Sequence, residues 1–181
     1  MVVAALLPAL LFAFPLWKIT LEAPQYPHGM SMYIWINQIT GDTPSTIQNM
    51  NILNHYVGMK YIEPDSIPEL KYFPYVTAAI IFFGLLAAVT NRPKVYLTWA
   101  IIFVLLGALG IYDFYLWEYD YGHNLSDTAP IKIPGQGYQP PLIGSKMLLN
   151  FKAVSWPSTG GIAMGLSMLS GFLAFWVGRK K

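Results

Sequence analysis

The chain of 181 residues contains no cysteine. Disulfide frameworks, thiolate metal sites and cysteine nucleophiles are therefore excluded. Charged residues are also scarce, at 11% of the chain, where an ordinary soluble domain has about 25%. Hydrophobic residues make up 55%, which leaves too little polar surface to cover a soluble protein. The composition predicts an integral membrane protein, and the net charge of +2 does not indicate nucleic-acid binding.

Four apolar segments divide the chain, at about residues 2–17, 73–89, 95–117 and 160–177. A spanning helix needs about 17–25 such residues, so the last three qualify and the first, which contains Pro8 and Pro15, is marginal. A cleaved signal peptide is the alternative for the first segment. Because that segment has no basic start and no clear cleavage site, a retained helix is favoured. The expected fold class is all-α: a four-helix transmembrane bundle, forming a single membrane domain over residues 1–181.

The distribution of charge predicts how the bundle is oriented. The linker Asn91-Arg92-Pro93-Lys94 and the terminal Arg179-Lys180-Lys181 contain no acidic residue. All nine Asp and Glu lie in the other two connections or at their membrane borders. Positive charge marks the cytoplasmic side, which predicts both chain ends inside. The connections 18–72 and 118–159 then become two ordered extracytoplasmic loops.

The three histidines and five of the eight methionines lie in these two loops, and four of those methionines are in the first loop. The candidates are His28, Met30, Met32, Met50, His55 and Met59 in the first loop and His123 in the second. Imidazole and thioether are a ligand set that suits copper, especially Cu(I), in a compartment where thiols would oxidise. The pattern predicts copper as the cofactor, bound by these seven residues.

Spacing groups the candidate ligands in the first loop. On an extended segment His28, Met30 and Met32 project to one side. Residues 46–61 are predicted to be helical, so His55 and Met59, four residues apart, share a face. Met50 would stand roughly 140° away from His55 on that helix and would need a bend to join them. Methionine is also a common core filler, so packing stays open as the alternative for these residues.

In the second loop we expect the third helix to continue to about Tyr121. Asp113 and Asp120 would then be carboxylates that support the metal ligands, and His123 would complete a three-histidine site. The alternative is an interfacial cap, in which Glu118 and Asp120 pair with lysines of the same loop. Residues 146–157 are expected to lie along the membrane surface.

Other chemistry finds little support in the sequence. There is no nucleophile elbow and no His-Glu-x-x-His motif, which disfavours a serine hydrolase and a zinc protease. No histidine falls within a span, which disfavours haem, and few polar residues lie there to form a transport pathway. No catalytic residue is predicted, and an enzyme is the less favoured interpretation.

Two strings carry a resemblance to a known group of proteins. They are Asn49-Met50-Asn51-Ile52-Leu53-Asn54-His55-Tyr56-Val57-Gly58-Met59 and Tyr138-Gln139-Pro140-Pro141-Leu142-Ile143-Gly144. From about residue 20 onward the chain resembles uncharacterised multi-span membrane proteins that some bacteria encode beside genes for nitrous oxide reductase maturation. The resemblance implies copper supply to an extracytoplasmic cupro-enzyme through the seven residues above. It does not imply catalysis by this chain.

Two functions remain open at this point. The first is a copper-binding accessory protein of the bacterial inner membrane, which presents its ligands on the periplasmic face for delivery to a cupro-enzyme. The second is a structural accessory subunit of a larger respiratory or monooxygenase complex, with or without a copper centre of its own. Both imply the lipid bilayer and membrane or periplasmic proteins as partners, and neither implies nucleic acid.

Overall fold

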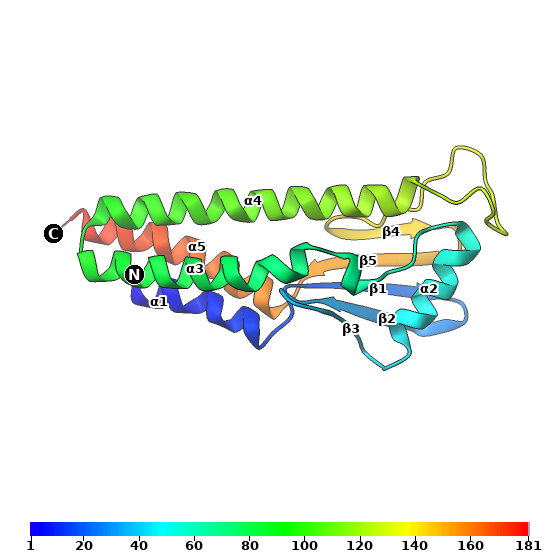
Figure 1. The fold of residues 1–181 in the computed structure, drawn as a ribbon, viewed down its shortest axis with the longest axis horizontal. Coiled ribbons are helices and arrows are strands. Elements are labelled where there is room, and N and C mark those ends of the chain that lie inside the picture. The colour runs from blue at the N-terminus through cyan, green and yellow to red at the C-terminus, as the bar shows by residue number, and fades with distance from the viewer. Residues whose placement is uncertain (181) are drawn as a thin grey trace.

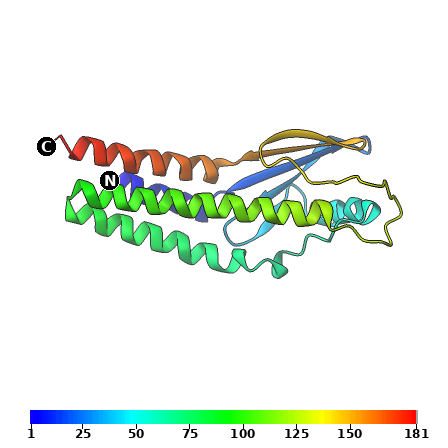
Figure 2. The same ribbon diagram turned by 90° about the horizontal axis from the view of Figure 1, so that it is seen from above.

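The computed structural model describes residues 1–180, and three helices in this range are long and apolar enough to span a membrane. They are α3 (Glu69–Thr90), α4 (Pro93–His123) and α5 (Thr159–Gly178). The three lie side by side, and α4 continues past the other two to run along a β-sheet (Figures 1 and 2). The N-terminus and the end of α5 lie away from the sheet (Figure 1).

The first apolar segment does not form a fourth spanning helix, so the expected four-helix bundle is wrong. It forms a five-residue α-helix, α1 (Val2–Leu6), followed by a 3-10 helix, η1 (Leu7–Phe12). Pro8, at the start of η1, has no backbone N–H to continue the α-helical hydrogen bonds. The short pair packs against α3 and α5, and the Ser167 hydroxyl donates a hydrogen bond to the Ala4 carbonyl at 2.6 Å.

The expectation of an all-α fold is also wrong, because the connections 18–72 and 118–159, together with Trp17, build a five-stranded antiparallel sheet. Its strands are β1 (Trp17–Ala23), β2 (Tyr26–Ile34), β3 (Ile39–Gly41), β4 (Gly144–Leu148) and β5 (Phe151–Pro157). The order across the sheet is β3-β2-β1-β5-β4. Aromatic and β-branched residues are frequent in β1, β2 and β5, which suits a pleated surface with one buried face.

The central pairing of the sheet joins the two connections into one body. β1 pairs with β2 on one side and with β5 on the other, with Trp17 opposite Pro157. The prediction that residues 146–157 lie along the membrane surface is wrong, because they form most of a strand hairpin that extends away from the bundle along the direction of the helices (Figure 1). The protein is a mixed α/β membrane protein with an extramembrane sheet.

Helix α2 (Thr46–Val57) follows β3, and the 3-10 helix η2 (Pro64–Ser66) leads toward α3. Together with the far part of α4, α2 packs on one face of the sheet. The core between them holds Trp17, Ile19, Met30, Met32, Ile39, Met50, Ile62, Leu70 and Tyr121. A second core lies inside the bundle around Trp99, whose indole N–H donates to the Ile80 carbonyl at 2.9 Å.

The neighbouring helices α3 and α4 indicate where the membrane-spanning part ends. About 20 residues, at 1.5 Å each, cover a hydrocarbon core of roughly 30 Å. Counted from Pro93, such a span ends near Asp113, whose carboxylate is close enough to that of Glu69, in the first turn of α3, to interact with it. Residues 114–123 of α4 therefore belong to the extramembrane part, beside the sheet (Figure 2).

Candidate functional site

A cavity of about 550 Å³ opens at the end of the extramembrane part farthest from the bundle. It lies between the end of α2, the segment that follows it, the end of α4 and the loop after α4. Its lining includes His55, Met59, Lys60, Tyr61, Glu63 and Tyr121. Two of the seven predicted copper ligands, His55 and Met59, therefore face the same open space.

The segment 59–62 is fixed against α2 by asparagine side chains. Gly58 ends the helix with a left-handed backbone (φ 83°), which turns the chain so that it runs back along α2. The Asn54 amide donates to the Lys60 carbonyl at 3.2 Å. Asn51 accepts from the Ile62 N–H at 2.7 Å and donates to the Ile62 carbonyl at 3.2 Å. The helix predicted over 46–61 thus begins at Thr46 but ends at Val57.

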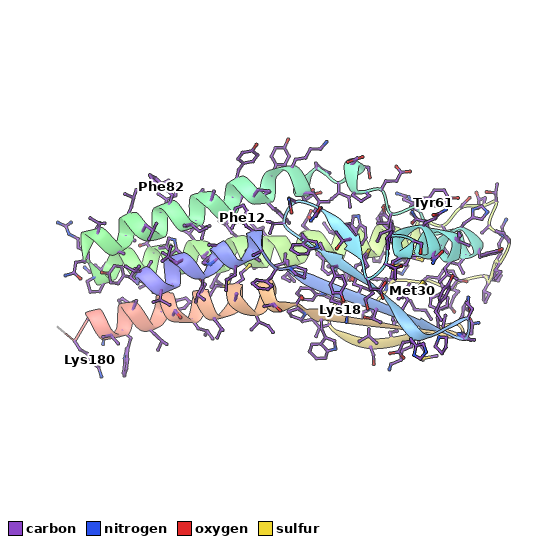
Figure 3. The ribbon with its side chains drawn as sticks, turned by 90° about the horizontal axis from the view of Figure 1, so that it is seen from below. Phe12, Lys18, Met30, Tyr61, Phe82 and Lys180 are labelled. Atoms are coloured by element: carbon purple, nitrogen blue, oxygen red, sulfur yellow. The ribbon has the colours of Figure 1, made fainter. Side chains whose placement is uncertain are left out.

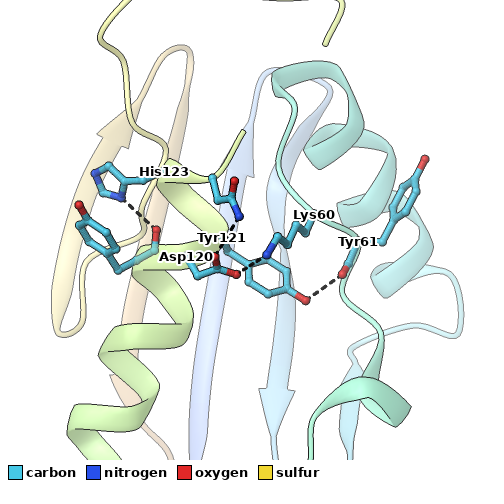
Figure 4. Close-up of polar contacts among 7 residues, drawn as sticks. Lys60, Tyr61, Asp120, Tyr121 and His123 are labelled. Carbon is cyan, nitrogen blue, oxygen red and sulfur yellow. Dashed lines mark hydrogen bonds and ion pairs between the residues drawn. The ribbon is translucent and has the colours of Figure 1, made fainter. Parts of the chain in front are cut away.

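Polar contacts attach the end of α4 to this segment (Figure 4). Lys60 Nζ lies 2.6 Å from an Asp120 carboxylate oxygen, and the Tyr121 hydroxyl donates to the Tyr61 carbonyl at 2.8 Å. The hydrogen bond from Lys60 lowers the pKa of Asp120, whereas burial raises the pKa of Tyr121. Asp120 therefore pairs with a lysine of the first loop, not with one of the second loop.

His55 is exposed at the edge of the cavity. Its ring is nearly parallel to that of Tyr61, with the ring centroids 6.3 Å apart, and its Nδ1 lies 3.4 Å from the Tyr61 hydroxyl. His55, Tyr61 and Glu63 also line a second hollow, of about 560 Å³, on the outer side of α2. The imidazole is thus accessible from two sides.

The other candidate thioethers cannot reach a metal ion in this cavity. Met30, Met32 and Met50 are all buried in the core between the sheet, α2 and α4, and act there as packing residues. His28 is exposed on β2 and is separated from the buried methionines by Gly29, which has a φ of 74°. The pairing of β1 with β2 is also irregular here, so the simple alternation that would place His28, Met30 and Met32 together does not hold.

The remaining candidates lie elsewhere. His123, at the end of α4, stacks on Tyr119 with ring centroids 4.1 Å apart, and its Nδ1 is 3.0 Å from the Tyr119 carbonyl (Figure 4). Asp113 lies at the membrane border near Glu69. Within residues 1–180, no three or more His, Asp or Glu side chains gather in a group able to hold a metal. The three-histidine site expected from the sequence is therefore not assembled.

Sequence reasoning missed the deepest ionisable residue of the extramembrane part. Glu118 is completely buried, and neither of its carboxyl oxygens has a hydrogen-bond partner among the described residues. Burial raises its pKa to about 8. Glu118 follows Phe114 by four residues and precedes Tyr121 by three, and both of those pack in the core. The helical phase of these aromatic residues was a signal that could have placed Glu118 on the inner face.

Comparisons of this chain with protein-family models, with curated proteins and with solved structures find no match.

Proposed function

We propose that the protein is a copper-binding accessory protein of the bacterial inner membrane, with His55 and Met59 as its ligands on the periplasmic face. The observation that supports this proposal is that these two side chains line one open cavity. An imidazole and a thioether suit Cu(I), and ligands this few release the ion readily by exchange. This ligand set is smaller than the seven residues that the sequence suggested.

In this proposal the residues around the cavity have different roles. His55 and Met59 would hold the ion, and copper bound there supplies no chemistry to this chain beyond its own transfer. Tyr61 holds the imidazole ring of His55 in position. The ion pair between Lys60 and Asp120 joins the segment after α2 to the end of α4, and both of these form the wall of the cavity. The exposure of His55 gives a partner cupro-enzyme direct access to the ligand.

The test is a Cu(I) competition with a colorimetric chelator, using the full chain in detergent. We expect His55→Ala and Met59→Leu each to weaken Cu(I) binding at least tenfold, a loss of about 1.4 kcal/mol for the removed ligand. Met59→Leu conserves volume, so its effect reports the sulfur and not the packing.

Matched controls come from candidates that lie away from the cavity. His28→Ala and His123→Ala remove exposed histidines elsewhere, and Met50→Leu removes a thioether from the core. These three variants are expected to bind Cu(I) as the unaltered chain does. Unchanged affinity in both His55→Ala and Met59→Leu would exclude the proposed site.

The second candidate, a structural accessory subunit, is favoured by apolar side chains exposed outside the spans. Ile131, Ile133, Ile143 and Met147 are all exposed on the loop after α4 and on β4, an edge strand of the sheet. Exposed apolar groups beside an unpaired strand edge suit contact with another protein. Purification in mild detergent with a stoichiometric partner, lost when Ile143 and Met147 are replaced by serine, would favour this function.

A further inference from the structure

One face of the sheet is left uncovered by α2 and α4. Ile19, Met30 and Met32 point into the core, so the alternate residues of β1 and β2 occupy the opposite face. On that face Lys18 of β1 pairs across the strands with Tyr33 of β2 and with Trp156 of β5. Side chains directly opposite one another in a sheet are near neighbours. The row Tyr33, Lys18 and Trp156, which we call the Lys18 row, is therefore contiguous.

The Lys18 row lies beside the membrane. Figure 3 shows Lys18 where the helical bundle meets the sheet. β5 ends at Pro157 and the span α5 begins at Thr159, so Trp156 is three residues from the start of α5. At about 3.4 Å per strand residue this distance is roughly 10 Å. The headgroup layer extends roughly 5–8 Å beyond the hydrocarbon core, and a lysine side chain is long enough to reach back into it.

Lys18 brings an uncompensated positive charge to this depth. The ion pairs between described residues are Lys60 with Asp120 and Lys152 with Glu22, and Lys18 takes part in neither. Glu22, the acidic residue of β1, is thus already paired. Lys18 Nζ lies instead 5.5 Å from the centre of the Tyr33 ring.

Aromatic side chains flank this charge on both sides. The Trp156 residue is 55% exposed. Tyrosine and tryptophan favour the headgroup region because each joins an apolar ring to a polar atom. A cation between two such rings matches a phosphate that sits above lipid chains.

We propose that the Lys18 row binds the phosphate of an anionic phospholipid headgroup, with Lys18 neutralising its charge and Tyr33 and Trp156 contacting the lipid around it. The site is separate from the copper proposal, because the cavity of His55 lies at the opposite end of the sheet. It would attach the end of the sheet nearest the bundle to the bilayer surface.

The test measures which lipids the full chain retains in nanodiscs made from phosphatidylglycerol and phosphatidylcholine, by native mass spectrometry of the released complex. We expect the unaltered chain to be enriched in phosphatidylglycerol. Lys18→Gln should weaken that retention about fivefold, the effect of one lysine at an anionic membrane surface. Lys18→Arg, which keeps the charge, should retain the lipid.

The matched control is Lys71→Gln, an exposed lysine in the first turn of α3 at the same border of the membrane. It is expected to leave lipid retention unchanged. Equal losses in Lys71→Gln and Lys18→Gln would show general charge attraction and would overturn the proposal, as would full retention in Lys18→Gln. Displacement of the lipid by sodium phosphate, but not by sodium chloride of equal ionic strength, would assign the site to free phosphate and overturn the lipid assignment.

Discussion

Glu118 places a carboxyl group inside the packed face of α4 where nothing described pairs with it. In the unfolded chain this acid ionises around its ordinary pKa of 4.5, whereas burial raises the folded pKa to about 8. Folding therefore favours the protonated form. Its contribution to stability is complete below pH 4.5 and is lost as the pH rises through about 8.

Replacement of Glu118 by glutamine removes this dependence. Glu118→Gln keeps the shape of the side chain without a charge, so we expect a higher unfolding temperature than that of the unaltered chain near pH 8. The two proteins should differ much less near pH 4.5, where the acid is protonated in both states. Thermal unfolding in detergent across this pH range measures the difference. Glu63→Gln, which alters an exposed carboxylate, is the control, and an identical pH dependence in both variants would contradict the assignment.

At the scale of single residues, the sequence could predict the position of some copper candidates but not of others. His55 and Met59 were expected to share a helix face because four residues separate them. Helix α2 ends at Val57, so Met59 reaches the same cavity through the turn at Gly58 and not through helical spacing. The burial of Met30 and Met32 could not be foreseen, because it depends on which face of β2 meets α2 and α4. A thioether is equally suited to both environments, so its residue type does not distinguish a ligand from a core residue.

At the scale of elements, the loop after α4 is attached to that helix by a close backbone approach. A Cβ at Gly122 would lie 2.3 Å from the backbone nitrogen of Gln139, which cannot move without displacing the loop. The Tyr138 N–H also donates to the Gly122 carbonyl at 2.8 Å. Glycine at this position therefore allows residues 137–139 to cover the end of α4.

Gly122→Ala is expected to detach this segment. The added methyl group overpacks the contact, which typically costs about 1–3 kcal/mol, and the loop should become more sensitive to limited proteolysis between residues 124 and 143. Gly110→Ala is the control on the same helix, because a Cβ there would meet no atom within 4 Å. Equal protease resistance in the two variants would show that the close approach at Gly122 does not hold the loop.

The helices and strands differ in how far the sequence predicts them. The spans α3, α4 and α5 follow from local composition, since any run of this length and hydropathy must be buried in lipid. Strands β1 and β5 depend on each other although Trp17 and Pro157 lie at opposite ends of the chain. Their alternating polar and apolar residues did not indicate strands, because no neighbouring segment supplies the pairing partner. The sequence contains Pro8 in the first apolar segment, but hydropathy alone does not show that the α-helix ends before this proline.

At the scale of the whole molecule, the extramembrane sheet and the turn between α3 and α4 lie at opposite ends of the bundle (Figure 1). The positive residues at that turn predict that it is cytoplasmic. Because the chain has no cysteine, single cysteines can test this directly. We expect Thr128→Cys to react with a membrane-impermeant maleimide in intact spheroplasts, and Thr90→Cys to react only after permeabilisation. The reverse pattern would place the sheet and its cavity in the cytoplasm.

The pairing of β1 with β5 also constrains the order in which the protein is made. β1 leaves the ribosome early, but its partner β5 follows only after α3 and α4, so the sheet cannot be completed until these helices have been synthesised. During that interval β1 and β2 would present an open strand edge, the kind of surface that joins chains into aggregates. The protein is therefore most prone to aggregation in the interval between synthesis of β2 and synthesis of β5. A chain interrupted before Phe151 would lack β5, and the edge of β1 would therefore stay open permanently.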